Sequence, residues 1–148
     1  MRRKAVIFGI KGKSLTNKEK RLFKDHKPWG VILFSRNIKN LQQTKKLIID
    51  IKLLMEDKKY PILIDEEGGS VSRLKKIIDM SLFSQDYFGK IFIKNRNKFY
   101  IYYKIYVQTV SSILNEIGVN INTVPVLDVK RKNTNKIIYN RSFSNDPN

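Results

Sequence analysis

Short apolar runs alternate with longer amphipathic stretches along this chain. Near-continuous apolar runs are typical of strands buried in a parallel sheet, and they predict strands over residues 5–10, 30–34 and 61–65. A fourth, less regular strand is expected over residues 119–124, where Pro125 ends it. In the longer stretches apolar residues recur every three or four positions, which predicts helices over residues 17–26, 41–56 and 97–117.

Polar residues mark the ends of these helices. Thr16 and Glu19 match a capping box, in which each side chain accepts a hydrogen bond from the backbone amide of the other residue. Asn40 offers a similar cap for the second helix, and Gly118 suits the left-handed residue that follows a helix. Residues 66–89 show neither period clearly, so we expect a loop with one short helix at most.

The alternation of strands and helices indicates an α/β protein with a parallel sheet. Two architectures have this order, a small doubly wound sheet and part of a (β/α)8 barrel. A complete barrel needs about 250 residues, so four strands in 148 residues would be half of one. The length suits one domain or part of one, and residues 1–148 are expected to hold no second domain.

Two absences narrow the class of protein. No run of about 18 apolar residues occurs, which argues against a membrane-spanning helix and a membrane partner. The chain has no Cys, so disulfides, thiolate metal sites and cysteine nucleophiles are excluded. We expect no metal and no other cofactor, and a cytoplasmic location fits the lack of cysteine.

The charge is a first cue for nucleic-acid binding, because 30 Lys plus Arg against 13 Asp plus Glu give a net charge of +17. The basic residues are spread over the whole chain, however. The chain has 22 Lys, 20 Ile and 13 Asn, which share A/T-rich codons, so a biased genome accounts for the excess. The densest basic stretch, residues 90–104, interleaves with aromatic residues, as single-strand binders do. The helical spacing of Phe99, Tyr102, Tyr103 and Tyr106 favours a core-facing helix instead, which disfavours nucleic acid as a partner.

Candidate chemistry gathers where the predicted strands end. The third strand leads directly into three carboxylates, a Gly-Gly pair and Arg73, over residues 65–73. The second strand is followed by residues 35–37, and the fourth leads to Asp128. Because parallel sheets bind ligands at the carboxyl ends of their strands, polar groups at three such ends favour a binding site over solvated loops. Phosphate is a poor ligand for the acidic loop, since carboxylates repel an anion.

Four motifs, over residues 30–38, 65–74, 118–129 and 140–143, resemble glycoside hydrolase family 3, in particular its short bacterial β-N-acetylhexosaminidase branch. The resemblance implies a TIM-like (β/α)8 barrel, of which this chain would supply about four βα units. It also implies a retaining glycosidase that removes terminal N-acetylglucosamine from cell-wall fragments in the cytoplasm. The expected partner is therefore a carbohydrate, an N-acetylglucosaminide.

The resemblance also assigns residue roles. Asp65 matches an aspartate whose carboxylate accepts hydrogen bonds from sugar hydroxyls, and Arg73 and Arg141 match two arginines that line the same sugar pocket. A carboxylate accepts and a guanidinium donates, so these groups together suit hydroxyls that do both. The supporting residues are expected to be Glu67, Gly68 and Gly69 in the turn, and Asp128, which we expect to orient Arg141.

The match lacks the catalytic groups. In this branch the nucleophile is an aspartate late in the chain and the acid/base is a histidine on a mobile loop, and both are expected beyond Asn148. The one histidine here, His26, falls in the first helix, far from the strand ends, and is expected to be a surface residue. Ser70 also replaces a frequent arginine and Ser144 a usual glycine.

Three hypotheses follow. The first is a β-N-acetylhexosaminidase fragment that carries sugar-binding residues without catalytic ones, and the second is a sugar-binding half-barrel that has lost catalysis. The third, disfavoured, is a basic nucleic-acid-binding module. Half a barrel would leave the outer edges of its first and fourth strands unpaired, so self-association or a complementary C-terminal half is expected.

Overall fold

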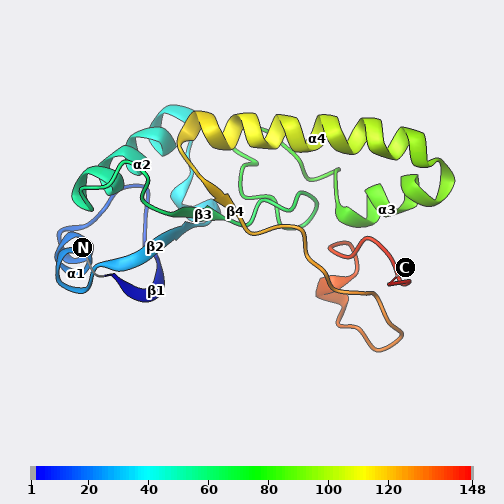
Figure 1. The fold of residues 1–148 in the computed structure, drawn as a ribbon, viewed down its shortest axis with the longest axis horizontal. Coiled ribbons are helices and arrows are strands. Elements are labelled where there is room, and N and C mark those ends of the chain that lie inside the picture. The colour runs from blue at the N-terminus through cyan, green and yellow to red at the C-terminus, as the bar shows by residue number, and fades with distance from the viewer. Residues whose placement is uncertain (1–2, 148) are drawn as a thin grey trace. The chain divides into compact units, whose positions relative to one another are not determined.

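The computed structural model describes residues 3–147, shown in Figure 1. Its order of strands, helices and two short 3-10 helices follows the predicted alternation. The elements are β1 (Lys4–Gly9), α1 (Asn17–His26), β2 (Pro28–Leu33), η1 (Ser35–Asn37), α2 (Leu41–Leu54), β3 (Ile62–Ile64), α3 (Gln85–Lys94), α4 (Arg96–Ile117), β4 (Ile121–Asn122) and η2 (Lys136–Ile138).

The strands form one parallel sheet in the order β1-β2-β3-β4. In the register, Val31 of β2 lies beside Ile62 of β3, and Ile64 of β3 lies beside Asn122 of β4. Each new strand is added next to the previous one, with no reversal of direction along the sheet. A doubly wound sheet reverses its strand order at a switch point. The observed order is therefore that of four consecutive strands of a barrel, as predicted.

By its internal contacts the chain divides into two compact units, which are described separately. Unit 1 comprises the described residues up to Asp65 together with Ile113–Thr123, and so contains the whole sheet. Unit 2 comprises Glu66–Ser112 and the described residues from Val124 onward. The long helix α4 contributes to both units.

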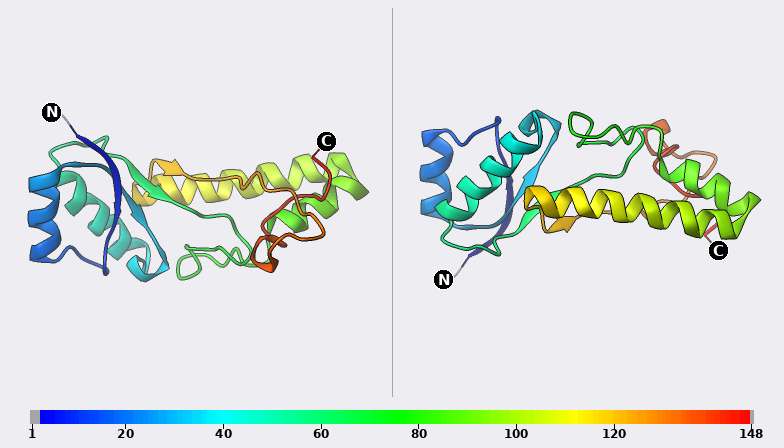
Figure 2. Two further views of the ribbon diagram at one scale, coloured as in Figure 1. Left: turned by 90° about the horizontal axis from the view of Figure 1, so that it is seen from below. Right: turned by 90° about the horizontal axis from the view of Figure 1, so that it is seen from above.

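In unit 1, helices α1 and α2 lie on the same side of the sheet (Figures 1 and 2). The predicted capping box is present at α1, where the Glu19 amide donates to Thr16 Oγ1 at 3.2 Å and the Thr16 amide donates to Glu19 Oε2 at 2.8 Å. At α2, Asn40 Oδ1 accepts from the amide of Gln43 at 2.9 Å. The core between helices and sheet is formed by fully buried aliphatic side chains of α2, β2 and β3, namely Val31, Leu33, Leu47, Ile48, Ile51, Ile62 and Ile64.

The first strand differs from its prediction. Its near-continuous apolar sequence predicts a strand buried on both faces, but the structure leaves β1 largely exposed, with Ile7 42% accessible. The cause is position, because β1 lies at one edge of the sheet and pairs only with β2 among the described strands. At the opposite edge β4 is confined to two residues, shorter than the predicted 119–124.

Unit 2 is built around aromatic side chains. Helix α3 ends at Lys94, five residues beyond the segment 66–89 in which we expect one short helix at most, and only Asn95 separates it from α4. We call the side chains of Phe83, Phe88, Tyr103, Tyr106 and Phe143 the aromatic cluster. Within it the ring centroids of Phe88 and Tyr103 lie 4.9 Å apart, and those of Phe88 and Tyr106 lie 5.0 Å apart.

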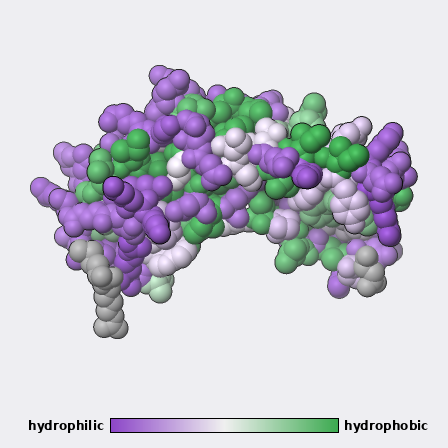
Figure 3. All heavy atoms as spheres, turned by 45° about the horizontal axis from the view of Figure 1, so that its top comes forward, coloured by the Kyte–Doolittle hydropathy of each residue, from purple (hydrophilic) through white to green (hydrophobic). Residues whose placement is uncertain are grey.

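The aromatic cluster confirms that α4 turns aromatic residues inward, with one correction. The spacing of the helix predicts a core position for Tyr102, but this side chain is 46% exposed, because it lies on the flank of the helix next to Tyr103. Figure 3 shows hydrophobic side chains among hydrophilic ones on the face that it presents. Along residues 3–147, no helix combines the length and the apolar character that a membrane crossing requires.

Candidate functional site

Asp65 lies at the carboxyl end of β3, in unit 1. Its carboxylate oxygen Oδ1 accepts a hydrogen bond of 3.2 Å from the hydroxyl of Thr123, which follows β4. The Thr123 amide donates to the carbonyl of Ile64 at 2.9 Å and so continues the β3–β4 ladder. The parallel register thus holds the Asp65 side chain at the strand end where the sequence predicts a binding residue.

In unit 2 the loop after Asp65 turns sharply at two glycines. Gly68 and Gly69 have φ values of +73° and +58°, a conformation that favours glycine. A Cβ on Gly68 would lie 2.3 Å from the carbonyl oxygen of Phe83, and one on Gly69 would lie 2.7 Å from Cβ of Ser84. Each of the two positions therefore requires glycine for two reasons. Its φ angle is positive, and other parts of the chain pack closely against it.

Glu66 is a buried carboxylate within this loop, with 1% of its surface exposed. Its Oε2 accepts from the amides of Arg73 at 2.6 Å and Leu74 at 2.8 Å, and its Oε1 accepts from the amide of Gly68 at 3.3 Å. Burial raises the pKa of Glu66 above its ordinary value, although these hydrogen bonds act in the opposite direction. The sequence places Glu66 only among three adjacent carboxylates and gives no sign of this structural role.

Glu67 and Arg141 form a two-pronged ion pair. Arg141 Nε donates to Glu67 Oε2 and Arg141 Nη2 donates to Glu67 Oε1, both at 2.8 Å. The Glu67 side chain is 4% exposed and that of Arg141 is 23% exposed. This geometry fixes the plane of the guanidinium, which a single hydrogen bond would not do. The structure thus joins two residues that the sequence places 74 positions apart.

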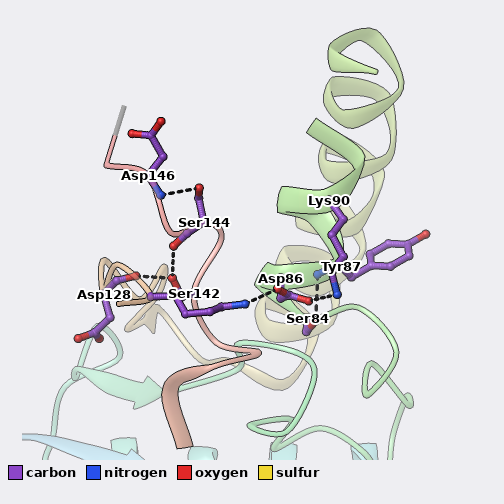
Figure 4. A network of polar contacts seen from close by, with 9 residues as sticks. Ser84, Asp86, Tyr87, Lys90, Asp128, Ser142, Ser144 and Asp146 are labelled. Carbon is purple, nitrogen blue, oxygen red and sulfur yellow. Dashed lines mark hydrogen bonds and ion pairs between the residues drawn. The ribbon is translucent and has the colours of Figure 1, made fainter. Parts of the chain in front are cut away.

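The segment that carries Arg141 is anchored by two buried polar side chains. Ser142 is fully buried, and its hydroxyl lies 2.6 Å from the carbonyl oxygen of Asp128 and 2.9 Å from that of Ser144 (Figure 4). The side-chain amide of Gln85, in the orientation that satisfies its donors and acceptors, donates to the Arg141 carbonyl at 2.6 Å and pairs with both backbone groups of Val126. The sequence pattern predicts neither anchor.

Asp128 therefore reaches this segment through its backbone. The carboxylate in contact with the Arg141 guanidinium is that of Glu67, whereas the Asp128 carbonyl accepts from Ser142. Glu67 thus orients Arg141 in this structure, and a contribution of Asp128 to this orientation stays a prediction.

Asp86 forms a second ionic contact near this segment, at the start of α3 (Figure 4). Its two carboxylate oxygens lie 2.8 Å from Lys130 Nζ and 2.5 Å from Lys90 Nζ. Burial alone would raise the pKa of Asp86, but the hydrogen bonds and charges of the two lysines outweigh it and hold this pKa below its ordinary value. The contact between Asp86 and Lys130 connects the loop at residue 130 to α3.

The strand-end residues after β2 have a structural role. Asn37 is fully buried, and its Nδ2 donates to the carbonyls of Ile10 at 3.1 Å and Gly12 at 2.7 Å. Arg36 Nε donates to the same Ile10 carbonyl at 3.0 Å. These side chains close the loop after β1. His26 is exposed on α1, as predicted, with its Nδ1 at 3.0 Å from Lys4 Nζ.

The side chains predicted to bind sugar carry both kinds of hydrogen-bonding group. Asp65 carries acceptor oxygens, and Arg73 and Arg141 carry donors, which are the groups that hydroxyls require. Over residues 3–147, no three His, Asp or Glu side chains converge in a way that would hold a metal ion. Arg73 and Arg141, with Glu67, Gly68 and Gly69, belong to unit 2, and Asp65 belongs to unit 1.

Comparison with known sequences gives a consistent family. Residues 5–148 match the family model of the glycosyl hydrolase family 3 N-terminal domain. A beta-hexosaminidase of Hydrogenovibrio crunogenus is 30% identical over 142 residues, which are 96% of this chain and 39% of that protein. Beta-hexosaminidase A of Pseudoalteromonas piscicida is 30% identical over 122 residues, 80% of this chain and 20% of that protein. The chain thus spans less than half the length of these curated relatives.

Solved structures agree with the sequence relatives. The crystal structure of NagZ from Neisseria gonorrhoeae in complex with N-trifluoroacetyl-D-glucosamine has a TM-score of 0.86 at 29% identity, over 98% of this chain and 43% of that one. The β-N-acetylglucosaminidase of Paenibacillus sp. str. FPU-7 shares the fold with a TM-score of 0.74 at 23% identity. With a family match over nearly its whole length and this fold, the chain belongs to glycosyl hydrolase family 3, to its N-terminal domain.

Proposed function

We propose that this chain binds a terminal N-acetylglucosamine residue of a cell-wall glycan fragment, as the N-terminal part of one β-N-acetylhexosaminidase barrel domain in the cytoplasm. The observation that carries the proposal is the Glu67–Arg141 pair, which holds a guanidinium in a fixed plane beside a Gly-Gly turn. The NagZ relative that matches this chain was solved in complex with N-trifluoroacetyl-D-glucosamine, which supports a ligand of this class.

Each proposed contact follows from the chemistry of its side chain. Asp65, held by Thr123, accepts hydrogen bonds from sugar hydroxyls. Arg73 and Arg141 donate to hydroxyl and carbonyl oxygens, and a fixed guanidinium loses less freedom on binding than a mobile one. Glu67 has its two carboxylate oxygens on Arg141, so it acts by positioning this arginine.

The chain by itself is proposed to bind without turnover. Retaining hydrolysis needs a nucleophile and a proton donor about 5 Å apart, flanking the glycosidic bond. The family's acid/base histidine has no counterpart here, since the one histidine is exposed on α1 beside Lys4. A second polypeptide segment, in the same chain or another, would have to supply both catalytic groups.

Calorimetric titration with methyl β-N-acetylglucosaminide tests the binding. We expect saturable 1:1 binding, and Arg141→Ala should weaken it at least about tenfold, because a charge-assisted, two-pronged donor is lost. Arg131→Ala is the matched control, since Arg131 is an exposed arginine ten positions away in the same unit, and it should leave the affinity unchanged. No saturable binding, or equal loss in both variants, would contradict the proposal.

Turnover is tested separately with a chromogenic N-acetylglucosaminide. The purified 148-residue chain should release no chromophore above the buffer rate. Release that disappears in Asp65→Ala would show that the chain carries its own catalytic groups and would overturn the claim that it binds without turnover.

A further inference from the structure

Glu66 is a buried carboxylate that accepts hydrogen bonds from three backbone amides of its own loop. We propose that Glu66 is a positioning residue, which holds Arg73 in place for sugar binding by fixing the backbone on both sides of the turn. The proposal rests on the function proposed above and adds to it a residue that determines the affinity without touching the sugar.

The geometry of the contacts carries the proposal. Glu66 Oε2 accepts at 2.6 Å from the amide of Arg73 itself and at 2.8 Å from that of Leu74, while Oε1 accepts at 3.3 Å from Gly68. One side chain thus joins the start of the turn to its end. The carboxylate is inaccessible to solvent, so water does not compete for these amides.

The loop is fixed on the far side of Arg73 as well. Leu74 is fully buried, and its carbonyl accepts from the amides of Ile77 at 2.7 Å and Ile78 at 2.9 Å. Arg73 therefore lies between a buried anchor and the Glu66 carboxylate. Because ordering a residue's backbone has an entropic cost of its own, a backbone that is already fixed at Arg73 leaves less for sugar binding to order.

A carboxylate fits this role better than other side chains of its size. It offers two acceptor oxygens and no donor, which matches three converging amides. A glutamine could keep one oxygen on Arg73 and Leu74, but its NH2 group would then face the Gly68 amide. A leucine would leave all three amides without this acceptor, and a buried amide that has lost its acceptor destabilises the conformation that buries it.

The experiment combines amide hydrogen exchange by NMR with the affinity for methyl β-N-acetylglucosaminide, on the full 148-residue chain. For Glu66→Leu we expect exchange at Gly68, Arg73 and Leu74 to accelerate at least about tenfold and the affinity to fall at least about tenfold. Glu66→Gln should accelerate exchange at Gly68 alone, with the affinity within about threefold of the wild type. Glu116→Gln, at an exposed glutamate of α4, is the control and should change neither measurement.

A double-mutant cycle separates positioning of Arg73 from general support of the fold. If Glu66 acts through Arg73, then Glu66→Leu should weaken binding no further once Arg73→Ala is present. Additive losses would overturn the proposal, as would a folded Glu66→Leu chain with unchanged exchange and affinity. If Glu66→Leu does not fold, Glu66→Gln decides, because equal acceleration at all three amides would contradict the geometry. If the wild-type chain binds no sugar while the Glu66 variants still show the predicted changes in exchange, the proposed function is refuted and the backbone role of Glu66 stands.

Discussion

At the scale of single residues, the acidic turn has a structural explanation that its sequence does not disclose. Adjacent carboxylates beside two glycines indicate a binding site, because such a run repels itself and costs backbone entropy. In the structure, Glu66 is a backbone acceptor and Glu67 an ion-pair partner, and both glycines are required by their φ values and neighbours. Of the three carboxylates, Asp65 is left as the direct acceptor in the proposed function.

Gly68→Ala tests the turn. A Cβ at this position would lie 2.3 Å from the Phe83 carbonyl oxygen at a φ of +73°, so we expect the free energy of unfolding to fall by about 2–3 kcal/mol. Gly12→Ala is the control, because nothing lies within 4 Å of a Cβ there, and its change should stay within about 0.5 kcal/mol. Urea denaturation measures both, and equal stabilities would contradict the described turn.

Tyr60 gives a prediction for alkaline pH. This tyrosine is fully buried and donates to the Pro28 carbonyl at 2.9 Å. Burial raises its pKa from 10.0 to about 12, with the charge of Asp57 acting the same way and that of Arg3 opposing it. Since the unfolded chain ionises first, Tyr60 does not affect the pH dependence of stability below pH 10, and stability falls between pH 10 and about 12.

The expected loss over this range is about 3 kcal/mol, from two pKa units at about 1.4 kcal/mol each. Urea denaturation at pH 9 to 12 should show a steeper alkaline decline for the wild type than for Tyr60→Phe, which has no proton to lose. Absorbance at 295 nm should show one tyrosine ionisation well above pH 10 that is present in the wild type and absent from Tyr60→Phe. Parallel declines in the two proteins would refute the assignment.

At the scale of elements, the sequence predicts whether a segment is a helix or a strand better than it predicts where that segment begins and ends. The capping box at Thr16 and Glu19 is local, so the start of α1 could be read directly, and α4 followed from its long apolar period. Burial of β1 could not be read, because an edge strand and a central strand have the same local pattern. The bounds of α3 could not be read because neither period is clear over residues 66–89, where we expect one short helix at most, whereas α3 runs from Gln85 to Lys94.

The same limit applies to the candidate site. Asp65 follows from its place after a strand, which is a local property. The Glu67–Arg141 pair and the Gln85 contacts join segments more than 40 residues apart, and no periodicity or spacing predicts such pairs. Tyr102 was misplaced for a related reason, because the stripe of aromatic residues on α4 is wider than the face that the aromatic cluster covers.

Phe88→Ala tests the aromatic cluster as the core of unit 2. Phe88 is 1% exposed and its ring contacts those of Tyr103 and Tyr106, so its truncation should reduce the free energy of unfolding by about 3–5 kcal/mol. Tyr100→Ala is the control, since that side chain is 61% exposed on α4, and it should change stability by less than about 1 kcal/mol. A mild effect of Phe88→Ala would show that unit 2 has a different core.

At the scale of the whole molecule, charge and sheet edges act in opposite directions. The net charge of +17 keeps copies apart, whereas β1 and β4 present backbone groups at the two ends of the sheet. The charge itself has no assigned ligand. Lys90 and Lys130 form ion pairs with Asp86, and Lys45 forms one with Glu116, so some of the positive charges make contacts within the fold.

Analytical sedimentation of the isolated chain shows whether repulsion between copies or pairing of the sheet edges dominates. We expect the isolated chain to self-associate, and to do so more strongly near 0.5 M salt than at low salt, because salt screens the repulsion between copies but not the pairing of strand edges. A monomer at every salt concentration would contradict the expectation that the edges need a partner.

We propose that this chain binds an N-acetylglucosaminide through Asp65, Arg73 and Arg141. The most direct measurement is an NMR titration of the isotope-labelled chain with methyl β-N-acetylglucosaminide, following backbone amides and arginine Nε–H signals. We expect saturable shifts at residues 65–73 and at the Nε–H groups of Arg73 and Arg141, with the Nε–H signals of Arg36 and Arg131 unchanged. Saturable shifts confined to other residues, or none at all, would contradict this proposal.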